Sequence, residues 1–195
     1  METRRVVFVG VGGQGNLLAS RLLGEASLSV GIPAVVSEIH GMAQRGGIVE
    51  SAVLMGDVTS PIVSNGEADV LIGFEPVETL RTLGKCNKET IVITNTQPLP
   101  PFTVSVGQGT YPPLDEIMGL IQAKAKQVIA LDGDALAAEA GNPLSLNMVM
   151  LGALIGSETI PISAEAMKET ISTSTKKAFL ESNLKAFDLG MRGAK

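Results

Sequence analysis

A buried strand, a glycine turn and a helix start follow one another at Val6-Val7-Phe8-Val9-Gly10-Val11-Gly12-Gly13-Gln14-Gly15-Asn16. The apolar run before the turn is typical of a strand that is covered on both faces of a parallel sheet. Gly10, Gly12 and Gly15 take the G-x-G-x-x-G spacing of dinucleotide-binding turns. Glycines also permit close packing against another protein, so this turn alone leaves nucleotide binding open.

The turn predicts a small electropositive concavity, because the first amides of a helix have no partner within the helix. Such amides bind anionic or carbonyl groups. The side chain of Gln14 both donates and accepts hydrogen bonds, which suits the backbone of a partner. The candidate binding residues of this first loop are Gly10, Gly12, Gly13, Gln14, Gly15 and Asn16.

Length and composition indicate one globular domain. The chain has 195 residues, of which 45% are hydrophobic and 18% are charged, so it can bury a sizeable core. Its net charge of −5 argues against a nucleic-acid partner. Apolar runs are too short for a membrane span, and the N-terminus leads straight into a strand without a signal peptide. We therefore expect a cytoplasmic protein that binds neither nucleic acid nor membrane.

Cys86 is the only cysteine. An internal disulfide therefore cannot form, and a single thiolate cannot hold an iron–sulfur cluster, which takes about four ligands. Lys85, Asn87 and Lys88 surround it after a helix stop, so we expect an exposed, reduced thiol without a chemical role. Asp132 and Asp134 fit loop and cap positions better than metal ligands, because no His or Cys accompanies them at metal spacing.

The rest of the chain alternates short apolar runs with helical patterns. Predicted strands cover 34–39, 48–55, 69–74, 90–95 and 127–132, with a short edge segment at 102–106. Predicted helices cover 17–28, 76–84, 114–125, 134–140, 144–155, 164–173 and 175–189. This order predicts a single three-layer, Rossmann-like α/β domain over residues 1–190, with a mostly parallel sheet, helices on both faces and an antiparallel edge. Gly190 is the expected helix stop, and residues 191–195 are an expected frayed basic tail.

Two segments carry further predictions. No helix separates the strands at 34–39 and 48–55, so the second of them is expected to be hairpin-linked, antiparallel and at an edge. Residues 144–155 are hydrophobic nearly all round, which is typical of a central helix or of a helix that a partner covers. The second alternative leaves open whether the isolated chain forms a homodimer or docks to a partner.

A second glycine-rich loop, His40-Gly41-Met42-Ala43-Gln44-Arg45-Gly46-Gly47, follows directly from a strand. Ligands of open α/β sheets gather at the carboxyl ends of strands, so we expect the two loops side by side. Arg45 suits a phosphate or carboxylate, or equally an internal bridge to Glu38 or Glu50. His40 is expected to be a loop hydrogen-bonding residue rather than a catalyst. The candidate binding residues of this second loop are His40, Gly41, Met42, Gln44, Arg45, Gly46 and Gly47.

Glu38 keeps the dinucleotide interpretation open. Such folds place an acidic residue about 20 positions beyond the glycines to bind the ribose, and Glu38 follows Gly15 by 23 residues. A stand-alone NAD(P)- or flavin-binding oxidoreductase is therefore one hypothesis, and a purely structural interaction module is another. The loop at 40–47 and the missing crossover helix count against dinucleotide binding.

The two loops together resemble a known family. Gly10-Val11-Gly12-Gly13-Gln14-Gly15 and Ser37-Glu38-Ile39-His40-Gly41-Met42-Ala43-Gln44-Arg45-Gly46-Gly47 are similar to the gamma-type subunit or domain of 2-oxoacid:ferredoxin oxidoreductases (the pyruvate/ketoisovalerate oxidoreductase gamma family). The sequence of the second loop most resembles that of the beta subunit of indolepyruvate oxidoreductases. Residues 68–75 and 183–187 share the likeness, which covers essentially the whole chain.

The resemblance implies a subunit of an enzyme that decarboxylates a 2-oxo acid on thiamine diphosphate, passes electrons through iron–sulfur clusters to ferredoxin and forms an acyl-CoA. This chain lacks a cysteine cluster, and Gly133-Asp134-Ala135 lacks the third glycine and the paired asparagines of a thiamine motif. Thiamine diphosphate and clusters are therefore expected on partner subunits, and no catalytic residue is expected in this chain alone. Its two loops are expected to face the shared active-site region and to help form the coenzyme A or thiamine pocket.

Overall fold

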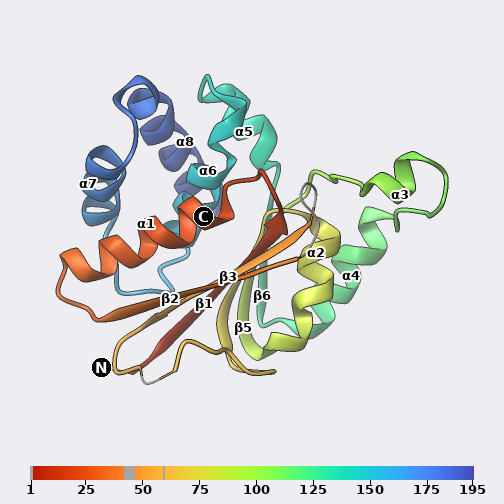
Figure 1. Cartoon of the computed structure of the whole chain (residues 1–195), viewed down its shortest axis with the longest axis horizontal. Coiled ribbons are helices and arrows are strands. Elements are labelled where there is room, and N and C mark those ends of the chain that lie inside the picture. The colour runs from red at the N-terminus through yellow and green to blue at the C-terminus, as the bar shows by residue number, and fades with distance from the viewer. Residues whose placement is uncertain (1, 42–46, 59) are drawn as a thin grey trace.

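A computed structural model describes residues 2–41, 47–58 and 60–195. Among these residues, six strands form one sheet in the order β2-β3-β1-β4-β5-β6 (Figure 1). The strands are β1 (Arg4–Val11), β2 (Ala34–His40), β3 (Ile48–Met55), β4 (Ala68–Gly73), β5 (Cys86–Asn95) and β6 (Gln127–Leu131). Strands β1, β4, β5 and β6 run parallel, whereas β3 is antiparallel to both of its neighbours.

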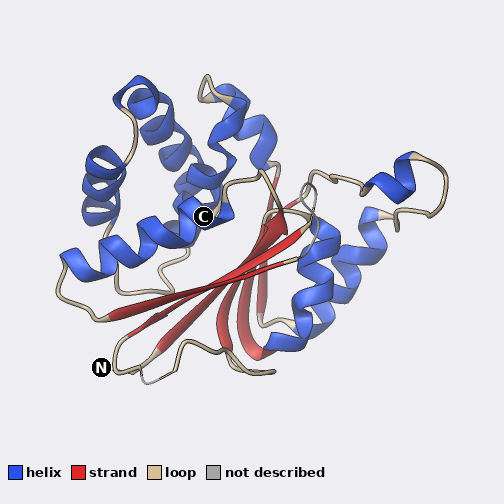
Figure 2. Cartoon of the chain, in the orientation of Figure 1, coloured by secondary structure: helices blue, strands red, loops and turns tan. Residues whose placement is uncertain are grey.

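Helices cover both faces of the sheet (Figure 2). They are α1 (Asn16–Ser29), α2 (Pro76–Arg81), α3 (Phe102–Ser105), α4 (Leu114–Lys124), α5 (Gly133–Glu139), α6 (Leu146–Gly156), α7 (Ala164–Ser174) and α8 (Leu180–Gly193), with short 3-10 turns at Thr82–Lys85, Pro143–Ser145 and Lys177–Phe179. Helices α1 and α5–α8 lie on one face, and α2 and α4 on the other. The predicted three-layer α/β architecture is therefore confirmed. Among the described residues, the helices are too short or too polar to cross a membrane.

The helices that follow β1 and β4 lie on opposite faces of the sheet. These two strands are parallel neighbours, but β1 leads into α1 on one face and β4 leads into α2 on the other. In such sheets the loops after the two strands diverge and leave a crevice at the carboxyl ends. The fold thus places the first glycine loop beside the most favourable ligand position of this sheet.

Strand β3 lies inside the sheet, so the prediction of an edge strand at 48–55 is wrong. It pairs with β1 on one side and with β2 on the other, so that Met55 lies opposite both Arg4 of β1 and Ala34 of β2. Val53 and Leu54 point to opposite faces, and both are almost fully buried. A strand that is covered on both faces favours a central position, which leaves β2 as the edge.

Helix α6 is the central helix of the larger apolar layer. Its residues from Leu146 to Ile155 are all buried, and it packs closely along α8. The alternative of a helix covered only by a partner is therefore wrong. A Cβ atom at Gly152 would lie 2.0 Å from the Phe187 carbonyl oxygen, and one at Gly190 would lie 2.0 Å from that of Val149. Glycine is required there because the two backbones touch.

Two local predictions are wrong. Helix α8 continues to Gly193, so residues 191–193 are helical and not part of a frayed tail. Gly190 serves the contact with α6 and does not end the helix. Residues 102–105 form the helical turn α3 and not an edge strand. Prolines at 98, 100 and 101 cannot donate to a sheet ladder, and Phe102 is 78% exposed.

The close contact between α6 and α8 predicts a large effect of one methyl group. Gly190→Ala should lower the free energy of unfolding by about 2 kcal/mol or more, because the backbones must separate. Gly119→Ala, on an exposed turn of α4 where nothing lies within 4 Å of the added Cβ, should instead raise it by up to about 1 kcal/mol. Urea denaturation measures both. Equal stability of Gly190→Ala and the unsubstituted chain would contradict the packing described.

Candidate functional site

At the carboxyl rim of the sheet, the structure places the first glycine loop against Gly47, the last residue of the second loop. The Gly12 amide donates a hydrogen bond to the Gly47 carbonyl oxygen at 2.9 Å. The Gly41 amide donates to the Ile48 carbonyl oxygen, also at 2.9 Å, and this bond closes the base of the second loop. His40 ends β2, where its backbone pairs with Val49. Met42, Gln44, Arg45 and Gly46, named above as candidate binding residues, lie outside the described residues.

The glycines of the first loop serve conformation and close packing. Gly13 and Gly15 have φ of 105° and 83°, a region that side chains disfavour. A Cβ at Gly15 would lie 2.8 Å from the side-chain nitrogen of Asn147, and one at Gly10 would lie 2.8 Å from Cβ of Phe74. The fold itself therefore requires glycine at these positions, with or without a ligand.

Internal hydrogen bonds hold several polar groups of the first loop. The Val11 amide donates to Gln14 Oε1 at 2.8 Å, and Gln14 Nε2 donates to the Phe74 carbonyl oxygen at 3.0 Å. Asn16 Nδ2 donates to the Val49 carbonyl oxygen at 2.8 Å. Together with the bond from Gly12, these contacts fill part of the predicted concavity. These bonds hold the loop in place from within the chain.

Asn95 organises the neighbouring loops. It is fully buried at the end of β5. Its Nδ2 donates to the Phe74 carbonyl oxygen at 3.1 Å and to Asp134 Oδ2 at 2.8 Å, and its Oδ1 accepts from the Gly133 amide at 3.0 Å. One side chain therefore ties together the ends of β4, β5 and β6. The sequence analysis missed this residue.

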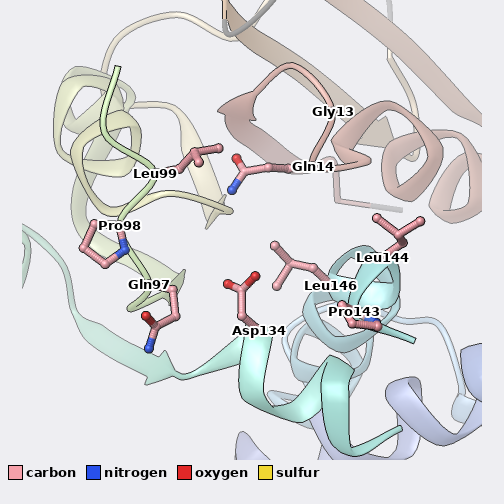
Figure 3. Close-up of a pocket in the computed structure, with 9 residues that line it drawn as sticks. All are labelled: Gly13, Gln14, Gln97, Pro98, Leu99, Asp134, Pro143, Leu144 and Leu146. Carbon is pink, nitrogen blue, oxygen red and sulfur yellow. The ribbon is translucent and has the colours of Figure 1, made fainter. Parts of the chain in front are cut away.

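A cavity of about 390 Å³ opens at this rim (Figure 3). Its lining consists of Gly13, Gln14, Gln97, Pro98, Leu99, Asp134, Pro143, Leu144 and Leu146. Leu144 is 80% exposed and Leu99 is 47% exposed. Among the described residues, the lining contains one carboxylate and no Lys or Arg. A diphosphate group needs cationic or multiple amide donors, and the described side chains of this lining supply no cation for the diphosphate of thiamine or of a dinucleotide.

A second cavity of about 430 Å³ lies on the α2 side of the first loop, next to Val11 and Gly12. Buried Glu75 caps α2 and accepts hydrogen bonds from the Tyr111 hydroxyl and the Leu99 amide. These bonds fasten residues 96–113 to the rim. Burial, followed by the hydrogen bond to Glu75, raises the pKa of Tyr111, so the phenol stays protonated and acts as a donor.

Glu78 lines the same cavity. Burial raises its pKa, although Arg81, which donates to Glu78 Oε1 at 2.9 Å, opposes that shift. The nearby carboxylate of Glu75 adds to the increase. The arrangement is an internal polar cluster that positions a loop, and the sequence analysis did not predict it.

Glu38 lies away from the first glycine loop. It is exposed on β2 and pairs with Ser51 of β3, which in turn pairs with Phe8 of β1. A whole strand therefore separates Glu38 from β1, or about 10 Å at the usual strand spacing. The structure does not bring the expected ribose-binding acid to the glycine turn.

Cys86 is buried, so the expectation of an exposed thiol is wrong. It begins β5 and joins the smaller apolar cluster between the sheet, α2 and α4. Burial raises its pKa to about 11. Asp132 caps α5 by accepting from the Ala135 amide at 2.9 Å, which agrees with the expected cap role.

Comparison with known proteins shows the class to which this fold and rim belong. Residues 5–193 match the profile of the pyruvate ferredoxin/flavodoxin oxidoreductase family, and the chain belongs to that family. It is 44% identical over 197 residues to "Indolepyruvate oxidoreductase subunit IorB" of Pyrococcus horikoshii, covering 100% of this chain and 98% of the relative. It is 28% identical over 193 residues to "2-oxoglutarate synthase subunit KorC" of Methanothermobacter thermautotrophicus, covering 97% and 95%.

A solved structure agrees with this assignment. The gamma subunit of the keto/oxoacid ferredoxin oxidoreductase from Geobacter sulfurreducens superposes with a TM-score of 0.72 at 25% identity, covering 98% of both chains. The resemblance to gamma-type subunits is therefore confirmed. The chain is a subunit of the 2-oxoacid:ferredoxin oxidoreductase family, similar to a subunit of an indolepyruvate oxidoreductase and to a subunit of a 2-oxoglutarate synthase.

The bonds of Asn95 predict a specific instability. Asn95→Asp would place a buried carboxylate against Asp134 and the Phe74 carbonyl, and should cost about 2–4 kcal/mol at pH 7. Its folded-state pKa should exceed the unfolded value of about 3.9, so the deficit should grow as pH rises from about 4 to 7. Asn65→Asp adds the same charge on an exposed loop and should change little. Denaturant titration of both variants at pH 5 and 7.5 tests this, and equal deficits at both pH values would contradict it.

The buried thiol predicts slow modification. With a pKa of about 11 in place of 9.0, the thiolate fraction at pH 8 falls roughly 100-fold, and burial slows access further. An aromatic disulfide reagent should label the native chain far more slowly than the chain in urea. Rapid stoichiometric labelling of the native chain would show that Cys86 is accessible.

Proposed function

We propose that this chain serves as one subunit of a multi-chain 2-oxoacid:ferredoxin oxidoreductase and contributes its glycine loops to an active-site region that partner subunits complete. The observation that carries the proposal is the hydrogen bond from Gly12 to Gly47. It joins the two loops that carry the family likeness, beside a cavity at the carboxyl rim. In the complete reaction a 2-oxo acid loses carbon dioxide and two electrons, ferredoxin takes the electrons, and coenzyme A takes the acyl group.

We assign the cofactors of that reaction to partner chains, because the described part of this chain does not fit them. Thiamine diphosphate supplies the carbanion chemistry of decarboxylation when it is bound, but the residues that the structure describes around the rim cavity include no cationic side chain for a diphosphate. The one cysteine is buried, and among the described residues no group of three or more His, Cys, Asp or Glu is placed to hold a metal ion. In this proposal the chemical steps therefore take place on groups that the partner subunits supply.

The rim itself suits a shared site. Leu144 and Leu99 present exposed apolar surface at the mouth of the cavity, where a partner could cover them and exclude water from a reacting centre. Gln14 and Asn95 hold the backbone beneath them rigid. The role proposed for this chain is thus to form one wall of the active site and to exclude water from it, while the partner supplies the reacting groups.

The alternative of a stand-alone dinucleotide enzyme has less support. The Gly12 amide is bonded to Gly47, and Glu38 is one strand too far from β1 to act as the ribose-binding acid. A purely structural module remains distinguishable by experiment, because a scaffold would affect assembly and not turnover. The 44% identity to an indolepyruvate oxidoreductase subunit leads us to propose an aromatic 2-oxo acid as the substrate of the complex.

The proposal predicts that activity requires partner subunits and depends on the rim. The chain alone should not reduce a viologen dye with indolepyruvate and coenzyme A, whereas the co-expressed complex should. Within the complex, Leu144→Asp should lower the turnover number at least 10-fold, because a charge would disturb the dry wall. Leu120→Asp, at an exposed site on α4, should leave turnover unchanged.

Sedimentation of each complex separates the hypotheses. Reduced turnover of Leu144→Asp in an intact complex supports a wall of the active site, whereas unchanged turnover in an intact complex would favour a scaffold. Robust turnover by the isolated chain would refute the subunit assignment. Preference for 2-oxoglutarate over indolepyruvate in kcat/KM would refute only the proposed substrate class.

A further inference from the structure

Strand β2 forms one edge of the sheet, and within the described residues no strand lies beyond it. Two hydrogen bonds at the ends of β2 show which of its residues bond to β3. The Gly41 amide donates to the Ile48 carbonyl, and the Gly56 amide donates to the Pro33 carbonyl. Antiparallel pairs alternate between bonded and non-bonded, so the odd-numbered residues of β2 bond to β3. The amides and carbonyls of Val36 and Glu38 therefore point outward, away from the sheet.

Exposed apolar side chains flank this edge. Val36 is 39% exposed and Ile39 is 64% exposed on β2 itself. On the face that carries α2 and α4, Ile39 lies near Ile48 at the start of β3. The Ser37 hydroxyl donates to the Pro61 carbonyl, which brings Ile62, 71% exposed, to the same edge. An edge with apolar side chains and outward amides is a template for another strand.

We propose that two copies of this chain associate through β2, antiparallel, with a two-fold axis at Ser37, so that the two sheets become one. The occupant is a second copy because the strand is self-complementary. The seven residues of β2 are centred on Ser37, and symmetric pairing then uses every residue of the strand. Val35 falls opposite Ile39 of the second copy, and Val36 falls opposite Glu38.

Other symmetric registers are worse. In a continuous sheet, side chains that lie directly opposite each other point to the same face. The two-fold axis must therefore pass through a residue and not between two residues, and the other registers have their axis at a different residue of β2. An axis at Glu38 would place two carboxylates directly opposite each other, which is destabilising. An axis at Val36 would move Ile39 beyond the end of the opposing strand. The axis at Ser37 keeps the two Glu38 side chains on a diagonal and buries both isoleucines.

This surface is separate from the rim that carries the proposed function, and it does not rest on that function. Edge pairing needs only backbone groups and the apolar side chains beside them. Glu38 has its own interaction within the chain, and the pairing assigns its carboxylate no contact across the axis. A strand pair with flanking side chains is a small interface, so we expect a concentration-dependent dimer.

The first test is a disulfide across the axis. In this register Ser37 and its symmetry mate form a non-hydrogen-bonded pair with Cα atoms about 4.5 Å apart, within the range for a disulfide. Ser37→Cys should therefore form a covalent dimer quickly under mild oxidation. Ser172→Cys, on an exposed position of α7, should not, and the native Cys86 is buried. Equal rates for the two variants would overturn the proposal.

The second test is the oligomeric state of the full chain by sedimentation over about 1–100 µM. Ile39→Lys should raise the dimer dissociation constant at least 10-fold, because it buries a charge at the pair. Leu120→Lys, at a 50% exposed site on α4, should not. A chain that is monomeric throughout this range would overturn the proposal, as would a dimer that Ile39→Lys leaves intact. Both results are independent of turnover in the complex, so they cannot be confused with failure of the subunit assignment.

Discussion

The main-chain carbonyl of Phe74 is the point on which the rim depends. It accepts hydrogen bonds from Gln14 of the first glycine loop and from Asn95 at the end of β5, while the Phe74 amide donates to the Val9 carbonyl. Asn95 extends the same network to Gly133 and Asp134 after β6. Buried polar groups are costly unless they are paired, so this fully bonded cluster fixes several loops at once.

The insertion of β3 between β1 and β2 changes what a familiar glycine turn can do. In a dinucleotide-binding sheet the acid at the end of the second strand lies beside the first strand. Here β3 occupies that position, and its start, through Gly47, takes the Gly12 amide. The same strand arrangement that removes Glu38 from the turn therefore delivers the second loop to it. The insertion of β3 thus puts a hydrogen-bonded contact between two loops where a dinucleotide-binding fold has its nucleotide pocket.

Local patterns allowed most of the fold to be predicted, and contacts between distant residues explain what was missed. Apolar runs predicted β1, β4, β5 and β6, and of these β1 and β4 are buried on both faces. The place of β3 depends on pairing with both β1 and β2, which no local pattern encodes. Gly190 matched a helix stop, but its contact with Val149 decides its role. Asn95 and Glu75 end neighbouring strands, and that shared position was the available signal for their importance.

The two surfaces of the chain are mechanically connected. β2 offers its outer edge to a second copy, and its last residue, His40, leads directly to the bond between Gly41 and Ile48 that closes the second loop. That loop ends at Gly47, which holds Gly12 of the first loop. A strand gains rigidity when both of its edges are paired, because fewer of its backbone groups can open to water. Pairing at β2 would therefore stiffen the base of one glycine loop and, through it, the rim where partner subunits are proposed to meet this chain.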